Sequence, residues 1–220
     1  MDLLEAMRLT SATRRFSQRP VPDEVIYRVL DAARFAPSGG NRQGWRVVVV
    51  KDAAKRKAIR DLYLEPWKAY AEQRRPLATT PRRRRALEAA DQMAENLDKV
   101  PVHLVICVEL AALSITDAAL DRPSIVGGGS IYPFVHNILL ACTAEGLGSA
   151  ITTLLCVKEP ETFKLLGIPE GFAMAALVPL GYREDEAPAK LSRRPVEEIA
   201  TVDAFDGRPL GASSSREETR

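Results

Sequence analysis

The chain of 220 residues is long enough for one sizeable domain with its own hydrophobic core. Hydrophobic residues make up 46% and charged residues 27%, which is typical of a globular protein and excludes a disordered or fibrous chain. The formal net charge is only +2, and no apolar run is long enough to cross a bilayer. We therefore expect a cytoplasmic protein whose partners are small molecules, with no nucleic-acid and no membrane partner.

Apolar residues at helical spacing predict five helices, at residues 23–35, 53–63, 82–97, 131–145 and 158–166. Three apolar runs of strand length lie between them, at residues 45–50, 102–108 and 173–180. Residues 64–81 contain three prolines, and either a mobile lid or an irregular helix pair fits them. Few strands, widely separated by long helices, indicate an α/β or α+β layer with helices covering a small sheet.

Basic residues are concentrated at 68–85, where seven of them accompany the single acid Glu72. Four of these arginines, at 82–85, fall near the expected start of a helix, where cations oppose the helix dipole. A solvated charged surface is the commoner interpretation of such a run, and an anion-binding surface is the alternative.

Metal and thiol chemistry have little support. Cys107, Cys142 and Cys156 lie in apolar segments without CxxC spacing, as expected for small buried side chains in a reducing compartment. The chain has two histidines and no metal-binding motif, so no metal site is predicted, and His136 is interpreted as a core or interface residue. Ser130 follows three glycines and is interpreted as the N-cap of the next helix.

The most informative segment is Ala-Pro-Ser-Gly-Gly-Asn-Arg-Gln-Gly-Trp at residues 36–45. It ends one helix, offers polar side chains beside paired glycines, and leads into a buried strand. Taken alone, this pattern is typical of a helix C-terminal turn. It also suits a loop that approaches a flat heterocycle closely and donates hydrogen bonds to its edge.

Four further motifs accompany this loop: Thr-Arg-Arg-Phe at 13–16, Glu-Gly-Leu-Gly-Ser at 145–149, Leu-Gly-Tyr at 180–182 and Arg-Arg-Pro-Val-Glu-Glu at 193–198. In this order and spacing the chain resembles the nitroreductase family of FMN-dependent oxidoreductases over roughly residues 10–200. The resemblance implies an α+β fold with a small mixed sheet flanked by helices. It also implies an intertwined homodimer with FMN at the subunit interface. We expect one FMN-binding domain at residues 1–205 and a disordered tail at 206–220.

The resemblance also implies roles for individual residues. The FMN phosphate is expected to contact the basic residues Arg14, Arg15, Arg193 and Arg194. The flavin is expected to lie against the loop residues Pro37, Ser38, Gly39, Asn41 and Gln43. Its reactive edge is expected to face backbone N–H groups at Ile151, Thr152, Thr153 and Leu154. Residues 10–12 lack an additional arginine that many relatives carry there, so Arg14 is expected to bear more of the phosphate binding.

The activity implied is transfer of hydride from NADH or NADPH through FMN N5 to a nitroaromatic, quinone or enone acceptor. No side chain is expected to be an obligatory acid or base, so no catalytic residue is predicted. The alternative is a protein that binds or sequesters FMN without productive NAD(P)H turnover. A flavin-free helical regulatory protein is a third possibility, and the colour of the purified protein distinguishes it from the other two.

Overall fold

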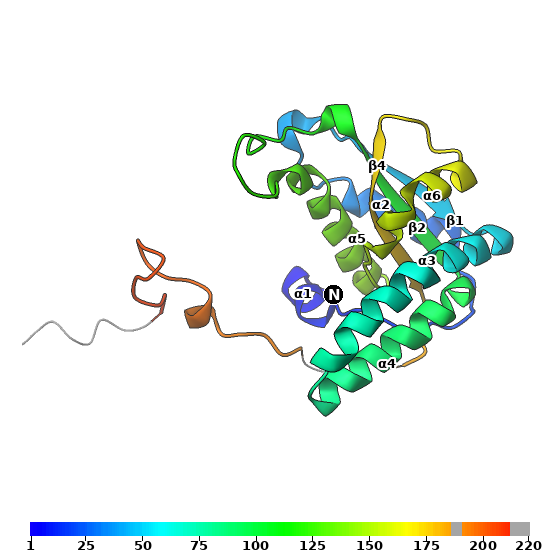
Figure 1. Ribbon diagram of the computed structural model, residues 1–220, viewed down its shortest axis with the longest axis horizontal. Coiled ribbons are helices and arrows are strands. Elements are labelled where there is room, and N and C mark those ends of the chain that lie inside the picture. Colours follow the sequence, from blue (N-terminus) through cyan, green and yellow to red (C-terminus); the bar gives the residue numbers. More distant parts are fainter. Residues whose placement is uncertain (186–190, 212–220) are drawn as a thin grey trace, which may run out of the picture. The chain divides into compact units, whose positions relative to one another are not determined.

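The computed structural model describes residues 1–185 and 191–211. The chain divides into two compact units, residues 1–188 and 189–220. The helices of the first unit are α1 (Leu3–Leu9), α2 (Asp23–Ala33), α3 (Ala53–Arg74), α4 (Pro81–Glu95), α5 (Tyr132–Ala144) and α6 (Glu159–Leu166) (Figure 1). Its strands are β1 (Trp45–Val50), β2 (Val102–Glu109), β3 (Gly148–Ser149) and β4 (Phe172–Gly181).

The four strands form one sheet in the order β1-β2-β4-β3, and every pairing between them is antiparallel. The α+β class is therefore confirmed, but the expected mixed sheet needs correction. In the part of the chain that the structure describes, the parallel pairing is confined to a single bridge between Ala12 and Ser149. The reason is that the α3–α4 pair returns the chain to the sheet in the opposite direction to β1, so no parallel crossover unit forms.

Side chains of β2 alternate between the two faces of the sheet and supply two separate cores. Leu104 and Ile106 face a core built with α2 and α5, in which Trp45 and Phe134 stack with their ring centroids 4.8 Å apart. Val105 and Cys107 face a second core that contains the apolar side of α3 and α4. This period of two is what a strand buried on both faces requires, and it sandwiches the sheet between helical layers.

All five predicted helices and all three predicted strands are present. Of the two alternatives for residues 64–81, a mobile lid or an irregular helix pair, the structure has a helix pair. Helix α3 continues through Pro66 to Arg74, and α4 begins at Pro81 after a short turn, η2 (Arg75–Leu77). Proline removes one backbone hydrogen bond from a helix interior. Burial of Tyr63, Trp67 and Ala71 on one side of α3 outweighs that loss.

The second unit is described over residues 191–211. It contains one short turn, η7 (Val196–Glu198), and an isolated antiparallel bridge between Thr201 and Pro209. Within the predicted tail, residues 207–210 therefore take part in backbone hydrogen bonds or the bridge, whereas residues 212–220 lie outside the described residues. Across both described ranges, no helix combines the length and apolarity that crossing a membrane requires.

Candidate functional site

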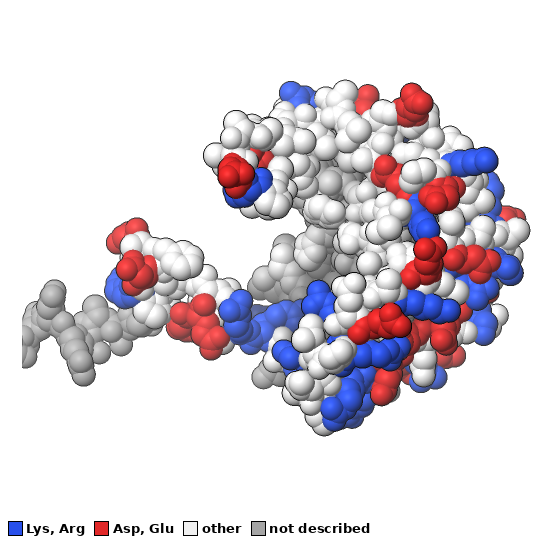
Figure 2. Space-filling view, in the orientation of Figure 1, with Lys and Arg blue, Asp and Glu red and all other residues white. Residues whose placement is uncertain are grey.

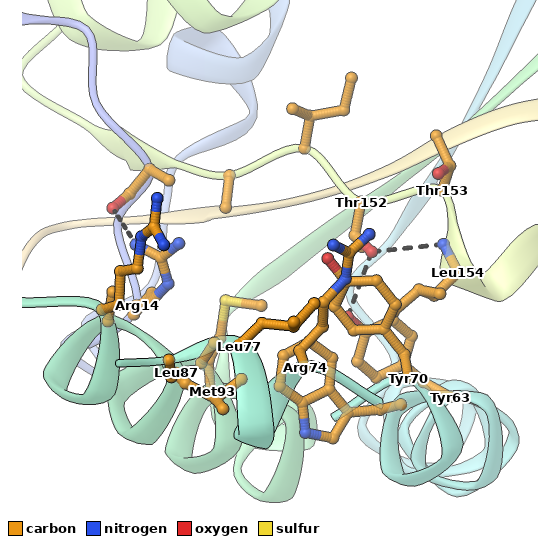
Figure 3. Close-up of a pocket in the computed structure, with 18 of the residues that line it drawn as sticks. Arg14, Tyr63, Tyr70, Arg74, Leu77, Leu87, Met93, Thr152, Thr153 and Leu154 are labelled. Carbon is orange, nitrogen blue, oxygen red and sulfur yellow. Dashed lines mark hydrogen bonds between the residues drawn. The ribbon is translucent and has the colours of Figure 1, made fainter. Parts of the chain in front are cut away.

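A cavity of about 1000 Å³ lies between α3, α4, the residues that follow β3 and the segment 12–14 that precedes α2; we call it the α3–α4 pocket. Figure 3 shows Tyr63, Tyr70 and Arg74 reaching into it from α3, and Thr152 facing them from the segment after β3. Arg14 stands at the other end of the same view. The volume lies at the upper end of the range for small-molecule sites, which is about 300–1000 Å³.

Arg14 is placed at the pocket because its segment is attached to two parts of the sheet. The Thr13 N–H donates to the Ser149 carbonyl at 2.8 Å, and the Ser17 N–H donates to the Tyr182 carbonyl at 2.9 Å. Arg14 lines the pocket and donates a 3.3 Å hydrogen bond to the Ala12 carbonyl. Arg15 points elsewhere, into ion pairs with Glu184 and Asp185. The two adjacent arginines therefore diverge, and Arg14 alone of the pair lines the pocket.

The Gly-Leu-Gly-Ser motif makes this attachment possible. Gly146 adopts a left-handed φ of 73° at the turn after α5, a conformation that favours glycine. A Cβ at Gly148 would lie 2.5 Å from the Thr13 Oγ1 and 2.7 Å from the Arg183 Cγ. Only glycine at position 148 lets the segment carrying Arg14 approach β3 so closely.

The segment 151–154 lines the pocket, but its backbone N–H groups are not equivalent. The Thr152 N–H donates to the Leu177 carbonyl at 3.0 Å, and the Leu154 N–H contacts the Thr152 Oγ1 at 3.4 Å. Within the described residues, the N–H groups of Ile151 and Thr153 have no partner, and both side chains are exposed. The expectation of four N–H donors therefore needs correction: the bridge to β4 occupies Thr152, and free donors remain at Ile151 and Thr153.

The loop at residues 37–43 is held in an unusual conformation away from this pocket. Asn41 and Gln43 adopt positive φ angles of 53° and 51°, and the Gln43 N–H donates to the Ser38 Oγ at 3.0 Å. Gly39 is anchored by its N–H, which donates to the Ser130 Oγ at 3.0 Å. The expectation that Ser130 is a helix N-cap is wrong, because residues 126–130 form a 3₁₀ turn and α5 begins only after Ile131.

The predicted flavin-contacting residues thus fall into two separate patches of the chain. One patch, comprising Arg14 and residues 151–154, lines the α3–α4 pocket, whereas the loop 37–43 does not. In Figure 1 the short turn η1 (Gly39–Asn41, light blue) lies at the top of the view beside η4 (Leu110–Ala112, green), and α1 lies below them. Figure 2 shows a hollow between these regions whose visible walls are largely uncharged.

Arg193 and Arg194 belong to the second unit, where both side chains are exposed. Their predicted role at the phosphate stays a prediction.

Sequence reasoning missed the wall of the pocket that α3 and α4 provide. Tyr63, Trp67 and Tyr70 recur at spacings of four and three residues, which places them on one face of α3. Arg74 and Arg83 also line the pocket. The spacing of these aromatic residues could have predicted the α3 wall of the pocket. The prolines nearby instead led to the prediction of an irregular segment.

The thiols offer no nucleophile. Burial raises the pKa of Cys107 and Cys142 to about 12 and that of Cys156 to about 11, so all three stay protonated near neutral pH. Cys107 and Cys142 are buried as predicted, and Cys156 is half-buried. His136 is exposed on α5 and is not a core residue. Among the residues the structure describes, no three His, Cys, Asp or Glu side chains cluster as metal ligands would.

The model of the nitroreductase family matches residues 8–182. The chain therefore belongs to the nitroreductase family, which confirms the resemblance found in the motifs.

Relatives in this family carry different names. The chain is 29% identical to an NADH dehydrogenase of Thermus thermophilus, over 90% of this chain and 95% of the relative. It is 29% identical to a 5,6-dimethylbenzimidazole synthase of Rhodospirillum rubrum, over 80% of this chain and 79% of the relative. It is 30% identical to an iodotyrosine deiodinase of Drosophila melanogaster, over 83% of this chain and 63% of the relative.

Solved structures agree on the fold. A crystal structure of oxidized iodotyrosine deiodinase bound to FMN and 3-iodo-L-tyrosine has a TM-score of 0.72 at 25% identity, covering 93% of this chain and all of that chain. A BluB-like flavoprotein from Clostridium difficile has a TM-score of 0.69 at 23% identity, covering 91% of this chain and 98% of that chain.

Proposed function

We propose that this protein is an FMN-dependent oxidoreductase that uses NADH or NADPH to reduce an organic acceptor of the nitroaromatic, quinone or enone class. The observation that carries the proposal is the lining of one pocket, where Arg14 has no carboxylate partner and two backbone N–H groups have no acceptor among the described residues. Family membership supports it further, as does the name NADH dehydrogenase in a relative that aligns over 90% of this chain.

The donor set of the pocket fits FMN. The Arg14 guanidinium has N–H groups left over after its single contact with Ala12, and arginine suits the planar fork of a phosphate monoester. The N–H groups of Ile151 and Thr153 would meet the ring edge, which carries acceptor atoms. The chemistry that a bound FMN supplies is transfer of a hydride, two electrons with one proton, between a nicotinamide and the acceptor.

The protein's own residues bind and orient in this scheme, and none acts as an acid or base. Thr152 fixes the direction of the neighbouring donors, because its own N–H and carbonyl both pair with Leu177. Alternate residues of an extended chain point in opposite directions, so Ile151 and Thr153 turn their N–H groups away from β4. These two N–H groups would orient the edge of the flavin by hydrogen bonding, and no side chain would be needed as a proton donor.

We also propose that the site is shared between the subunits of a homodimer. The loop 37–43 does not line the pocket of its own chain, so its predicted contact with the flavin requires a second copy. The borders of the hollow in Figure 2 support such a copy. They include α1, in which Leu3 and Leu4 are 62% and 60% exposed, and the segment 110–130, in which Ile125 is 76% exposed.

We further propose that the flavin-binding domain comprises residues 1–205. We also propose that the protein is located in the cytoplasm. All three cysteines are free, which suits a reducing compartment. Arg193 and Arg194 complete the proposed phosphate contacts.

The experiment is anaerobic titration of the purified protein with NADH and with NADPH, followed at the flavin absorbance band. Bleaching by either nucleotide, reversed by an acceptor such as a quinone, is the expected result. A yellow protein that neither nucleotide reduces would instead be an FMN-binding or FMN-sequestering protein. A colourless protein that does not take up added FMN would overturn both.

A further inference from the structure

Among the residues that the structure describes, three arginines line the α3–α4 pocket and no acidic residue does. Arg14 comes from the segment before α2, Arg74 from the end of α3, and Arg83 from the first turn of α4. The other lining residues are apolar, aromatic or hydroxyl-bearing. A low-polarity cavity with charges of one sign concentrates ions of the opposite sign.

The two arginines at the end of α3 have different surroundings. Arg75 donates to the Asp91 Oδ2 at 2.8 Å, while the Trp67 indole N–H donates to the other oxygen of the same carboxylate at 2.9 Å. Arg74 instead lies 5.1 Å from the centroid of the Tyr70 ring, and it has no ion pair within the described residues. Figure 3 shows its side chain directed across the pocket toward Thr152. Its charge therefore faces the cavity without a counter-charge.

Arg83 is the third residue of α4, and its backbone N–H contacts the Thr80 Oγ1 at 3.3 Å. A cation in the first turn is electrostatically unfavourable, since the N-terminus of a helix is itself positive. No carboxylate in residues 1–185 or 191–211 forms an ion pair with its side chain. An anion in the pocket would relieve the repulsion between Arg83, the helix end and Arg74.

The wall around these arginines suits a planar body. Tyr63 and Trp67 stack at 6.2 Å with an angle of 14° between their rings, and Tyr70 continues the row at 5.8 Å from Trp67. Tyr70 is the most exposed of the three, at 36%. Leu87 and Met93 of α4 supply the apolar surface opposite. Flat aromatic molecules pack well against such a surface.

We propose that the acceptor of this enzyme is an aromatic carboxylate, whose ring packs against the α3 aromatic row and whose carboxylate binds Arg74 and Arg83. The assignment rests on the proposed function, in which Arg14 is occupied by the FMN phosphate. It gives the arginine-rich segment 74–85 a specific purpose, the selection of an acceptor by charge.

The test compares 4-nitrobenzoate with 4-nitrobenzamide, which share a ring and a nitro group and differ in charge. Binding to the FMN-loaded protein is followed by fluorescence quenching, and kcat/KM is measured with the reduced nicotinamide that the protein accepts. Arg74→Gln and Arg83→Gln are compared with Arg82→Gln, a matched control on the same helix whose side chain does not line the pocket. All three positions are exposed, so the fold is expected to tolerate the changes.

We expect the parent protein to prefer the benzoate. Arg74→Gln and Arg83→Gln should each weaken benzoate binding about tenfold or more, as expected for loss of a charge-assisted bond. Benzamide binding and FMN retention should stay within about twofold of the parent values, and Arg82→Gln should resemble the parent.

Equal losses for both nitro compounds would overturn the proposal, as would loss of FMN or a change confined to the KM for NADPH. A failure of the proposed function looks different: NADH and NADPH would not reduce the flavin, whereas the binding titration would still report charge selection.

Discussion

The Tyr63 hydroxyl lies 3.1 Å from the Thr152 hydroxyl, which joins the wall of the pocket to the segment that carries its free N–H donors. Burial raises the pKa of Tyr63, so its hydroxyl stays protonated and able to donate. The contact connects α3 to a residue 89 positions further along the chain. It ties the α3 wall of the pocket, where we propose that the acceptor binds, to the segment that we propose faces the flavin edge.

We expect Tyr63→Phe and Thr152→Val to be coupled. Each change removes one hydroxyl and keeps the approximate shape of the side chain, so each should cost about 1 kcal/mol of unfolding free energy. The double variant should lose less than the sum of the two, by about 0.5–1.5 kcal/mol. Urea unfolding of all four proteins measures the coupling. Tyr27→Phe, at a residue that is 71% exposed, is the control and should be silent. Additive losses would show that the two hydroxyls act independently.

Arg14→Ala is expected to weaken FMN binding by roughly ten- to hundredfold, because a charge-assisted bond to phosphate is worth about 1.5–3 kcal/mol. Riboflavin lacks the phosphate and should lose little affinity, and Arg14→Lys should restore FMN binding only in part. Arg15→Ala is the matched control, since Arg15 pairs with Glu184 and Asp185 and does not line the pocket. If riboflavin and FMN weakened equally, Arg14 would support the ring or the fold and not the phosphate.

Asn41→Ala should weaken FMN binding by about 1–2 kcal/mol. The melting temperature should fall only slightly, because the residue lies on an exposed loop and the cost to the fold is that of alanine at a positive φ of 53°. A shared site makes a further prediction for mixed dimers. One subunit carrying Arg14→Ala and one carrying Asn41→Ala should together form one intact site and one doubly altered site. Isolated mixed dimers should therefore bind FMN tightly at one of their two sites, and a freely exchanged equimolar mixture of the two variants should recover roughly a quarter of the tight sites. No recovery in verified mixed dimers would place both residues at a site within one chain.

Gly148→Ala is expected to reduce FMN affinity although the residue does not line the pocket. The added methyl group would lie 2.5 Å from the Thr13 Oγ1, so the segment that carries Arg14 must move away from β3. Gly167→Ala is the control: it adds a methyl group at a left-handed φ of 69° at the end of α6, does not line the pocket, and should lower stability without changing FMN affinity. FMN titration at a temperature well below unfolding separates the two variants. Unchanged affinity in Gly148→Ala would mean that Arg14 is positioned independently of this contact.

His103 predicts a pH dependence of stability. Its side chain is fully buried, with Nε2 lying 2.8 Å from the Leu97 carbonyl oxygen, and burial lowers its pKa from 6.5 to about 4. The unfolded chain therefore binds more protons than the folded chain between about pH 6.5 and 4. The free energy of unfolding is therefore not reduced by His103 above pH 6.5. It falls as the pH decreases from 6.5 toward 4, by up to roughly 3 kcal/mol.

His103→Leu should flatten this part of the stability profile, measured by urea unfolding at a series of pH values. His136→Leu, which removes the exposed histidine of α5, is the matched control. A parent slope that persists in His103→Leu would assign the dependence to other groups.

Local patterns in the sequence predicted most helices and strands close to their observed bounds. The β-branched run at 45–50 became β1 with its predicted bounds, and 102–108 became β2 with one further residue. The motifs around Arg14, Ser38 and Gly148 were sufficient to recognise the family, because the backbone geometry each needs depends on a few neighbouring residues. Local rules also led to errors. Pro66 predicted a break in a helix that buried aromatic residues hold intact, and Ser130 predicted a cap where its hydroxyl accepts a bond from Gly39.

The arrangement of the site was decided by tertiary structure alone. No spacing along the chain shows that Thr152 uses its N–H for β4 while Thr153 does not, because the partner Leu177 lies 25 residues away. The same holds for Arg74 and Arg75, which are adjacent in sequence. Arg75 pairs with Asp91 of α4, whereas Arg74 lies over the Tyr70 ring. The identity of a residue limits which contacts it can make. Which contact forms depends on which distant side chain the packed helices and sheet bring within reach.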